Sequence, residues 1–65
     1  MPEYKNSEML AIITEYVHNP RYRDILRRRF CDGYTYEEIA EDVSFSPQHV
    51  KYICTSYKPM LLSHL

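Results

Sequence analysis

Apolar residues recur at helical spacing in four stretches of the chain. The first stripe predicts an amphipathic helix over about residues 7–18, because its members lie three and four residues apart. The four stripes consist of Met9, Ile12, Ile13, Tyr16 and Val17; Tyr22, Ile25, Leu26 and Phe30; Tyr36, Ile39, Ala40 and Val43; and Val50, Ile53, Cys54 and Tyr57. Since the chain also has a single Gly and few β-branched runs, it predicts an all-α domain over a hairpin-rich sheet.

Turn signals separate the first three stripes. Asn19-Pro20 ends the first helix, because the residue before a proline is pushed out of the helical region. The same pair starts the second helix, with Asn19 as N-cap and Pro20 at the first helical position. Asp32-Gly33 closes the second helix, where glycine supplies the left-handed residue that commonly follows a helix end. These breaks predict a small four-helix domain that spans residues 1–65.

Residues 32–50 hold two helix starts in close succession, in the stretch "DGYTYEEIAEDVSFSPQHV". Thr35 and Glu38 form a capping box, in which the hydroxyl accepts from the N–H of Glu38 and the carboxylate reaches back. Ser46 caps the next helix, and Pro47 occupies its first turn. Two helices joined by a three-residue break predict a helix-turn-helix within the domain.

The break and the C-terminal tail each leave an alternative open. Small Ala40 lies where the two helix backbones approach, and Ser44 stands where the motif usually has a turn glycine. A left-handed residue other than glycine costs about 1 kcal/mol. A plain helical hairpin with no role on DNA is the alternative to a helix-turn-helix. Pro59 ends or kinks the fourth helix, and the apolar tail of residues 59–65 either continues it or forms a short fifth helix.

Size and residue types limit the chemistry that the chain can carry. A domain of 65 residues buries only about 60% of the surface of its unfolded chain, which leaves little room for an enclosed active site. His18, His49 and His64 lie far apart without the spacing of metal ligands, and the sequence has no glycine-rich phosphate loop. We therefore expect no enzyme activity, no metal and no cofactor.

Cysteine spacing and hydropathy bear on the compartment. Cys31 and Cys54 lack C-x-x-C spacing and no secretion signal is seen, so reduced thiols are expected, with a disulfide as the less favoured alternative. The longest apolar run, residues 9–13, is far short of the roughly 20 residues needed to cross a bilayer. We expect a cytoplasmic protein with no membrane partner.

Charged residues alternate in blocks, although the formal net charge is only -1. Near neutrality argues against a nucleic-acid binder held by bulk electrostatics. Residues 21–31 carry five arginines against one aspartate, and residues 32–42 carry only acids. From residue 43 onward the only charges are Lys51 and Lys58. One face can therefore be basic while the molecule as a whole is not.

The stretch "ILRRRFCDGYTYEEIAEDVSFSPQHVKYI" resembles the fourth conserved region of bacterial sigma factors, the helix-turn-helix that reads the upstream promoter element. The resemblance covers about residues 20–58, and the chain looks closer still to short phage and prophage regulators built on that region alone. The matching pieces are Ile25-Leu26, Arg29-Phe30, Asp32-Gly33, Thr35, Glu37-Glu38-Ile39-Ala40, and Ser46 through Ile53.

The resemblance implies a set of base contacts. In the family, the recognition helix lies in the major groove and exposed residues of its first two turns touch bases. The corresponding residues are Pro47, Gln48, His49, Lys51 and Tyr52. Gln can pair bidentately with adenine, and Lys can donate to guanine or to a phosphate. Sigma factors commonly have an arginine where Pro47 stands and an acidic residue where Gln48 stands, so recognition of the usual promoter hexamer does not carry over.

A second set of residues is predicted to contact DNA phosphates, where backbone N–H groups and basic side chains favour an anion. These residues are Thr35, Tyr36, Arg27, Arg28 and Ser46. The alternative for Arg27-Arg28-Arg29 is a solvated helix face that offsets the acids that follow, with Arg29 paired to an acid of the next helix.

These observations lead to a function hypothesis with two alternatives. The first is a sequence-specific double-stranded DNA-binding transcription regulator of phage or prophage origin. Because affinity depends on neutralised phosphates, it should act as a homodimer or beside another DNA-bound protein. The first helix and the tail residues Leu61, Leu62 and Leu65 either make that contact or close the domain's own core. The alternatives are an adaptor that docks on RNA polymerase or a sigma factor without reading DNA, and a phage DNA-packaging accessory.

Overall fold

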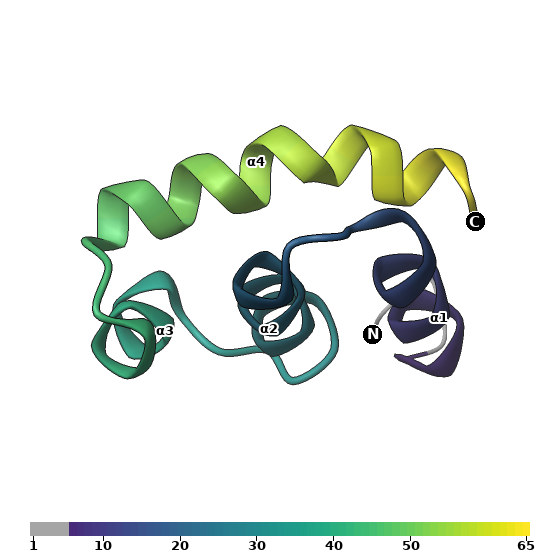
Figure 1. Cartoon of the computed structure of the whole chain (residues 1–65). Helices are drawn as coiled ribbons and strands as arrows, with labels where there is room; N and C mark the ends of the chain where they lie inside the picture. Colours follow the sequence, from purple (N-terminus) through teal and green to yellow (C-terminus); the bar gives the residue numbers. More distant parts are fainter. Residues whose placement is uncertain (1–5) are drawn as a thin grey trace.

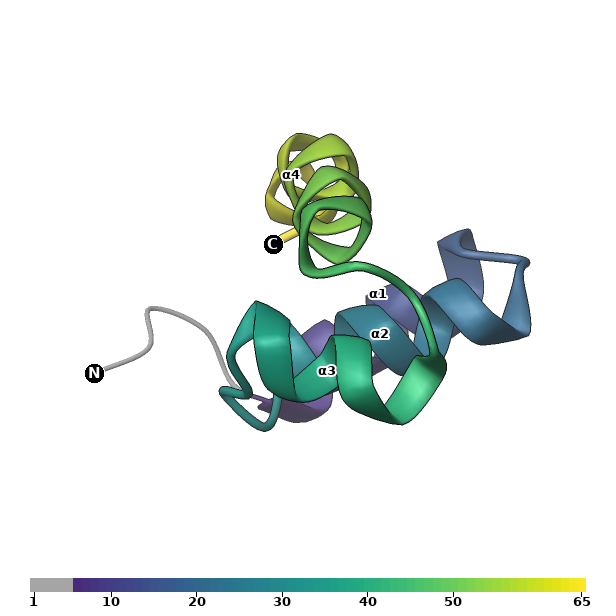
Figure 2. The ribbon, with the colours of Figure 1, turned by 90° about the vertical axis from the view of Figure 1, so that its left-hand side faces the viewer.

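The computed structural model describes residues 6–65, and within this range the chain is entirely helical. Its helices are α1 (Asn6–Tyr16), α2 (Pro20–Phe30), α3 (Tyr36–Val43) and α4 (Pro47–Ser63). The first three lie side by side in a row with α2 in the middle, and α4 crosses over all three (Figure 1). Figure 2, seen from the α3 end, shows α4 nearly end-on above the row. The predicted all-α domain is confirmed.

The core lies between the row of three helices and α4, and every helix contributes to it. The buried apolar residues are Met9, Ile12, Ile13, Val17, Ile25, Leu26, Ile39, Ala40, Val50, Ile53, Cys54 and Leu61. They include most of the four stripes expected from the sequence. No polar or charged side chain of residues 6–65 is buried, so the fold is held by apolar packing rather than by an internal polar network.

Three side-chain caps start the helices where the sequence predicts them. The Asn19 side chain accepts from two N–H groups in the first turn of α2. The hydroxyl of Thr35 accepts from Glu38 N at 3.2 Å, and Thr35 N donates to Glu38 Oε1 at 2.9 Å, so the capping box is complete. Ser46 Oγ accepts from His49 N at 3.1 Å. Each cap stabilises its helix start by about 1 kcal/mol.

Two residues with positive φ make the breaks around α3. Gly33 has φ 76°, and a Cβ built at this position would meet no atom within 4 Å, so glycine is needed for backbone conformation rather than for space. Ser44 ends α3 with φ 62° and ψ 32°, in the left-handed region. The predicted helix-turn-helix break is therefore present, and Ser44 carries a strain of about 1 kcal/mol that a glycine would not.

The fourth helix does not end at Pro59, and there is no separate fifth helix in the described range. α4 continues through the proline to Ser63. A proline inside a helix removes one backbone hydrogen bond, to the carbonyl four residues earlier, which here belongs to Thr55. Both Thr55 and Pro59 are exposed, so water can satisfy that carbonyl. Complete burial of Leu61 beyond the proline favours continuation of the helix.

The end of α1 meets the end of α4 at one edge of the molecule. Tyr16, expected in the apolar stripe of the first helix, is instead 44% exposed and stacks on His64, with ring centroids 3.9 Å apart. The first helix ends at Tyr16, two residues before the expected boundary. Of the apolar tail, Leu61 belongs to the core, whereas Leu62 and Leu65 are exposed. The tail therefore closes the core with one leucine only.

Both cysteines are free thiols. Cys54 lies in the core, and burial raises the pKa of its thiol to about 11. Cys31 is half-buried at the end of α2, and burial, together with the charge of Asp32, raises its pKa as well. Both groups are therefore protonated and unreactive at neutral pH.

Candidate nucleic-acid interface

One side of α4 faces solvent along the whole helix. The α4 outer face is formed by Gln48, Lys51, Tyr52 and Thr55, which recur at intervals of three and four residues and are all exposed. Tyr52 is the most open of the large apolar side chains, at 69% exposure. Three of the five predicted base contacts thus lie together on one surface. Pro47 is exposed at the first helical position, at the start of the same helix.

The charge of this helix is of one sign. Lys51 and Lys58 are its only residues with a full charge, and neither forms an ion pair with a carboxylate in the range 6–65. Ser46, a predicted phosphate contact, precedes them as the cap, with its oxygen already accepting from the backbone. Its hydroxyl proton is left to donate. The N-terminal half of α4 therefore presents hydrogen-bond donors and positive charge.

His49 lies beside the α4 outer face rather than on it. Its ring stacks on Phe45, with centroids 4.5 Å apart and the ring planes 23° apart. Phe45 belongs to the turn before α4, and the guanidinium carbon of Arg21 lies 5.4 Å from the centroid of its ring. His49 is therefore directed back toward the turn and toward α2.

The predicted phosphate contacts at the start of α3 are partly engaged inside the molecule. The Glu38 carboxylate accepts a hydrogen bond from the backbone N–H of Thr35. Hydrogen bonding with Thr35 holds the pKa of Glu38 below its ordinary value. The ring of Tyr36 lies under the guanidinium of Arg29, with the guanidinium carbon 4.4 Å from the ring centroid. An incoming phosphate at Thr35 would meet the Glu38 carboxylate.

Arg27 and Arg28 are held by three aspartates. Arg27 contacts Asp24 at 2.8 Å and Asp32 at 2.9 Å. Arg28 contacts Asp24 at 3.2 Å through Nε, and its Nη1 pairs with Asp42 at the end of α3. We call these five residues the arginine–aspartate network. It joins α2 to α3 and to the loop between them.

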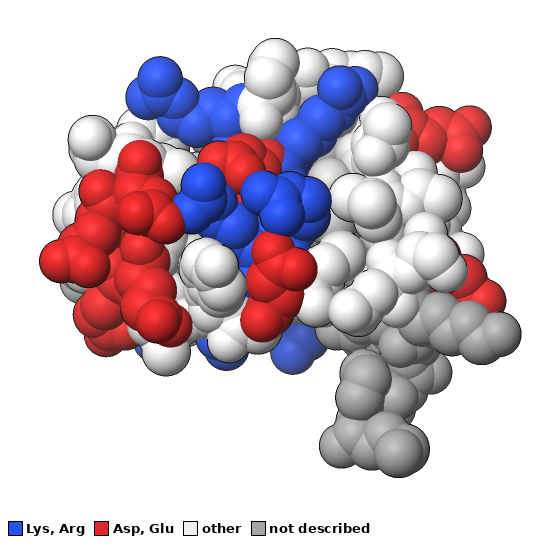
Figure 3. Space-filling view, turned by 90° about the horizontal axis from the view of Figure 1, so that it is seen from below, with Lys and Arg blue, Asp and Glu red and all other residues white. Residues whose placement is uncertain are grey.

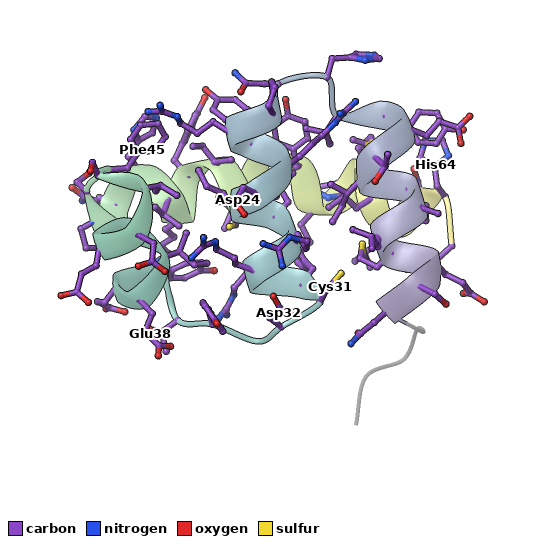
Figure 4. All side chains as sticks on the ribbon, turned by 60° about the horizontal axis from the view of Figure 1, so that its bottom comes forward. Asp24, Cys31, Asp32, Glu38, Phe45 and His64 are labelled. Atoms are coloured by element: carbon purple, nitrogen blue, oxygen red, sulfur yellow. The ribbon has the colours of Figure 1, made fainter. Side chains whose placement is uncertain are left out.

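The arginine–aspartate network lies on the side of the molecule away from α4. Figure 4 shows Asp24 and Asp32 in front of α2, with α4 behind the row of helices. Seen from that side, basic side chains at the centre are bordered by acidic ones, and a larger acidic area covers α3 (Figure 3). The acidic residues of α3 are Glu37, Glu38, Glu41 and Asp42. The structure therefore does not bring Arg27 and Arg28 together with the α4 outer face.

Asp24 is the shared acceptor of the network. Burial raises the pKa of its carboxyl, but hydrogen bonds from Arg28 and Arg27, together with their charges, outweigh this and hold the pKa below its ordinary value. The same partners raise the pKa of Arg28, with the hydrogen bond to Asp24 as the largest cause. Asp24 and Arg28 are therefore both charged at neutral pH.

One protein family matches the part of the chain that contains α2, α3 and the turn before α4. The family described as Sigma-70, region 4 matches residues 19–55, more than half of the chain. The chain belongs to the sigma-70 region 4 family. No curated protein and no solved structure matches it.

Membership identifies α3, the turn and α4 as the family's DNA-binding helix-turn-helix, with α4 as the recognition helix. The matched range contains α2, α3 and the first half of α4, whereas α1 and the last turns of α4 lie outside it. In helix-turn-helix proteins the recognition helix lies in the major groove. The α4 outer face is therefore the candidate DNA surface.

Two further arginines near the region 4 helix-turn-helix were not among the predicted contacts. Arg21 is exposed beside Phe45, one residue away from the predicted second helix start. Arg29 donates to the carbonyl oxygen of Tyr34 at 2.9 Å, and in the described range it pairs with no acid of the next helix, so the predicted pairing of Arg29 was wrong. No sequence signal predicts that the first turn of α2 contacts the turn before α4, because this contact depends on how the helices pack.

Two other properties of the described residues bear on function. In residues 6–65, no group of three or more His, Cys, Asp and Glu side chains is placed so that it could hold a metal ion. Nor is any helix of this range long and apolar enough to span a membrane.

Proposed function

We propose that this protein is a sequence-specific, double-stranded DNA-binding transcription regulator of phage or prophage origin that acts in the cytoplasm. One observation carries the proposal: the outer face of a region 4 recognition helix presents Gln48, Lys51 and Tyr52 to solvent, on a helix without any acidic residue. The opposite side of the molecule holds its arginines in ion pairs and is acidic over α3.

The side chains on that face suit base readout. Gln48 can donate to N7 and accept from N6 of an adenine, and Lys51 can donate to a guanine or to a phosphate. Tyr52 can touch a thymine methyl group with its ring. Pro47 and Gln48 replace the arginine and the acid that sigma factors commonly have, so we propose a target other than the usual promoter hexamer.

The monomer offers few phosphate contacts, so we propose that it works as a homodimer or beside another bound protein. Arg21, Lys51 and Lys58 are the exposed basic side chains on or next to α4. Leu62 and Leu65, 42% and 48% exposed at the end of α4, are the apolar side chains available for that contact. Leu61, the third leucine of the tail, is fully buried in the domain's own core.

Docking on RNA polymerase is the second candidate function. Membership of the sigma-70 region 4 family favours it, because the region also contacts polymerase in sigma factors. The acidic side of α3 lies away from the α4 outer face, so a protein partner could be bound there while DNA occupies α4 (Figure 3).

Fluorescence anisotropy with a labelled random-sequence duplex tests the DNA proposal. We expect binding that weakens with salt, with a slope of log affinity against log salt of about -2 to -4, because each neutralised phosphate contributes about -0.9. No binding at low salt and high protein concentration would contradict the proposal.

A double variant separates the two candidate functions. Gln48→Ala with Lys51→Ala removes two exposed side chains of α4 and leaves the core unchanged. A DNA regulator should lose binding and promoter activity, whereas an adaptor should keep its capture of RNA polymerase and its activity. Circular dichroism of the variant provides the folding control.

A further inference from the structure

A stack of three side chains joins α2, the turn and α4. Arg21 lies over the ring of Phe45, at 5.4 Å from guanidinium carbon to ring centroid, and Phe45 stacks on His49 at 4.5 Å. Arg21 and His49 are exposed, whereas Phe45 is half-buried and packs against the core. The Phe45 ring, which packs against the core, therefore contacts the Arg21 guanidinium and the His49 ring at the start of the recognition helix.

The position of His49 suits a phosphate better than a base. Gln48, Lys51 and Tyr52 belong to the α4 outer face, and His49 is turned about 100° from Gln48 around a helix of 3.6 residues per turn. Its stacking on Phe45 directs it further toward the turn. When a helix lies in the major groove, its outer face meets the base edges and its flanks meet the phosphate backbones.

The charged residues next to His49, by a shared contact or in sequence, are basic. On α2 the cation is Arg21, which shares Phe45 with His49, and on α4 the basic residue closest in sequence is Lys51. The turn contributes the uncharged Phe45 and Ser46. At the end of α3, Asp42 pairs with Arg28, and no carboxylate in the described part of the chain forms an ion pair with His49.

We propose that His49 is a proton-dependent contact to a DNA backbone phosphate, and that Phe45 is the positioning residue that holds its ring. This inference rests on the DNA-binding function proposed above. It moves His49 from the base contacts to the phosphate contacts, and it makes the affinity of this regulator for DNA depend on pH.

The sign of the pH dependence follows from linkage. An imidazole changes charge between pH 5 and 8. A phosphate favours the charged form, so DNA binding takes up a proton at His49 and the affinity rises as pH falls. Uptake of one proton changes affinity by at most about tenfold per pH unit, and about tenfold in all is expected between pH 8 and pH 6.

The test is anisotropy with the random-sequence duplex from pH 5.5 to 8.0 at constant ionic strength. For the wild type we expect the Kd to rise about tenfold from pH 6 to pH 8. His49→Gln should bind with a Kd that changes by less than about twofold over the same range. His64→Gln is the matched control, because His64 also stacks on an aromatic ring, at the other end of α4. It should keep the wild-type profile.

Two more variants separate charge from structure. His49→Lys carries a permanent charge and should bind at pH 8 about as tightly as the wild type binds at pH 6. Phe45→Leu removes the stacked ring but keeps an apolar side chain in the turn, and it should flatten the pH profile while circular dichroism stays unchanged.

The outcomes separate this inference from the function on which it rests. Equal pH profiles for the wild type and His49→Gln, with salt-dependent binding by both, would overturn the role of His49 and leave DNA binding intact. An unchanged profile in Phe45→Leu would overturn the role of Phe45. No salt-dependent binding by the wild type at any pH would overturn the proposed function, and this inference with it.

Discussion

The two sides of this small domain carry basic residues in different settings. On the side away from α4, Arg27 and Arg28 contact three aspartates within one network. On α4, Lys51 and Lys58 stand on a helix with no acid and form no ion pair within residues 6–65. The arginines join α2 to α3, whereas the lysines face solvent.

The number of basic residues in a stretch of sequence therefore does not locate a nucleic-acid surface. The longest basic run is Arg27-Arg28-Arg29. Its side chains form ion pairs with aspartates, a hydrogen bond to a backbone carbonyl and a cation–π contact with a tyrosine ring. A phosphate can gain little from a guanidinium whose charge is already matched. A chain with net charge -1 can still offer a positive recognition helix, because its acids lie on other elements.

The largest expected effect is a loss of folding stability caused by a substitution in the core, which lies between the two sides. Ile53 is 2% exposed on the inner side of α4. Ile53→Ala should lower the free energy of unfolding by about 2–5 kcal/mol, because it removes buried methyl groups and leaves a cavity. Urea denaturation measures this loss. Thr55→Ala, on the outer side of the same helix, is the control and should change the stability by less than about 0.5 kcal/mol.

A smaller effect is expected from a substitution on the network side, which should lower stability without changing DNA binding. Arg28→Ala removes contacts to Asp24 and Asp42 that join α2 to α3. Because these side chains are partly exposed, the loss of stability should be about 1 kcal/mol, or about 4–8 °C in Tm. The salt slope of DNA binding should not change. A lower slope in this variant would mean that Arg28 reaches a phosphate after all.

The smallest effect is a pH dependence of the network side. The pKa of Asp24 is held below its ordinary value in the folded state, so its contribution to stability is present above the unfolded pKa and is lost as pH falls through the folded pKa. Between about pH 5 and pH 3, the wild type should lose a few tenths of a kcal/mol more than Asp24→Asn does. Thermal melts across this range measure it. Equal losses in the two proteins would contradict the account, and Glu15→Gln, outside the network, is the control.

Local signals in the sequence predict most of the fold. Asn19, Thr35 and Ser46 each bring an oxygen to a helix start, and these caps depend on neighbours within three residues. Apolar spacing likewise identifies the inner side of α4, and with it the exposed positions of Gln48, Lys51 and Tyr52.

What the sequence could not predict depends on residues far apart in the chain. Asp42 lies fourteen positions from Arg28, and only the packing of α3 on α2 brings them together. Arg21 reaches Phe45 in the same way. Helix α4 continues past Pro59 because Leu61 is buried, which local rules about proline cannot foresee.

A comparison of one basic residue from each side tests whether the DNA lies against α4. Lys51→Gln and Arg27→Gln each remove a single positive charge, and the salt dependence of duplex binding is measured for both by fluorescence anisotropy. We expect Lys51→Gln to reduce the magnitude of the salt slope by about 0.9, which corresponds to one phosphate contact, and Arg27→Gln to leave the slope unchanged. A reduced slope in Arg27→Gln with an unchanged slope in Lys51→Gln would place the DNA on the network side and contradict the account.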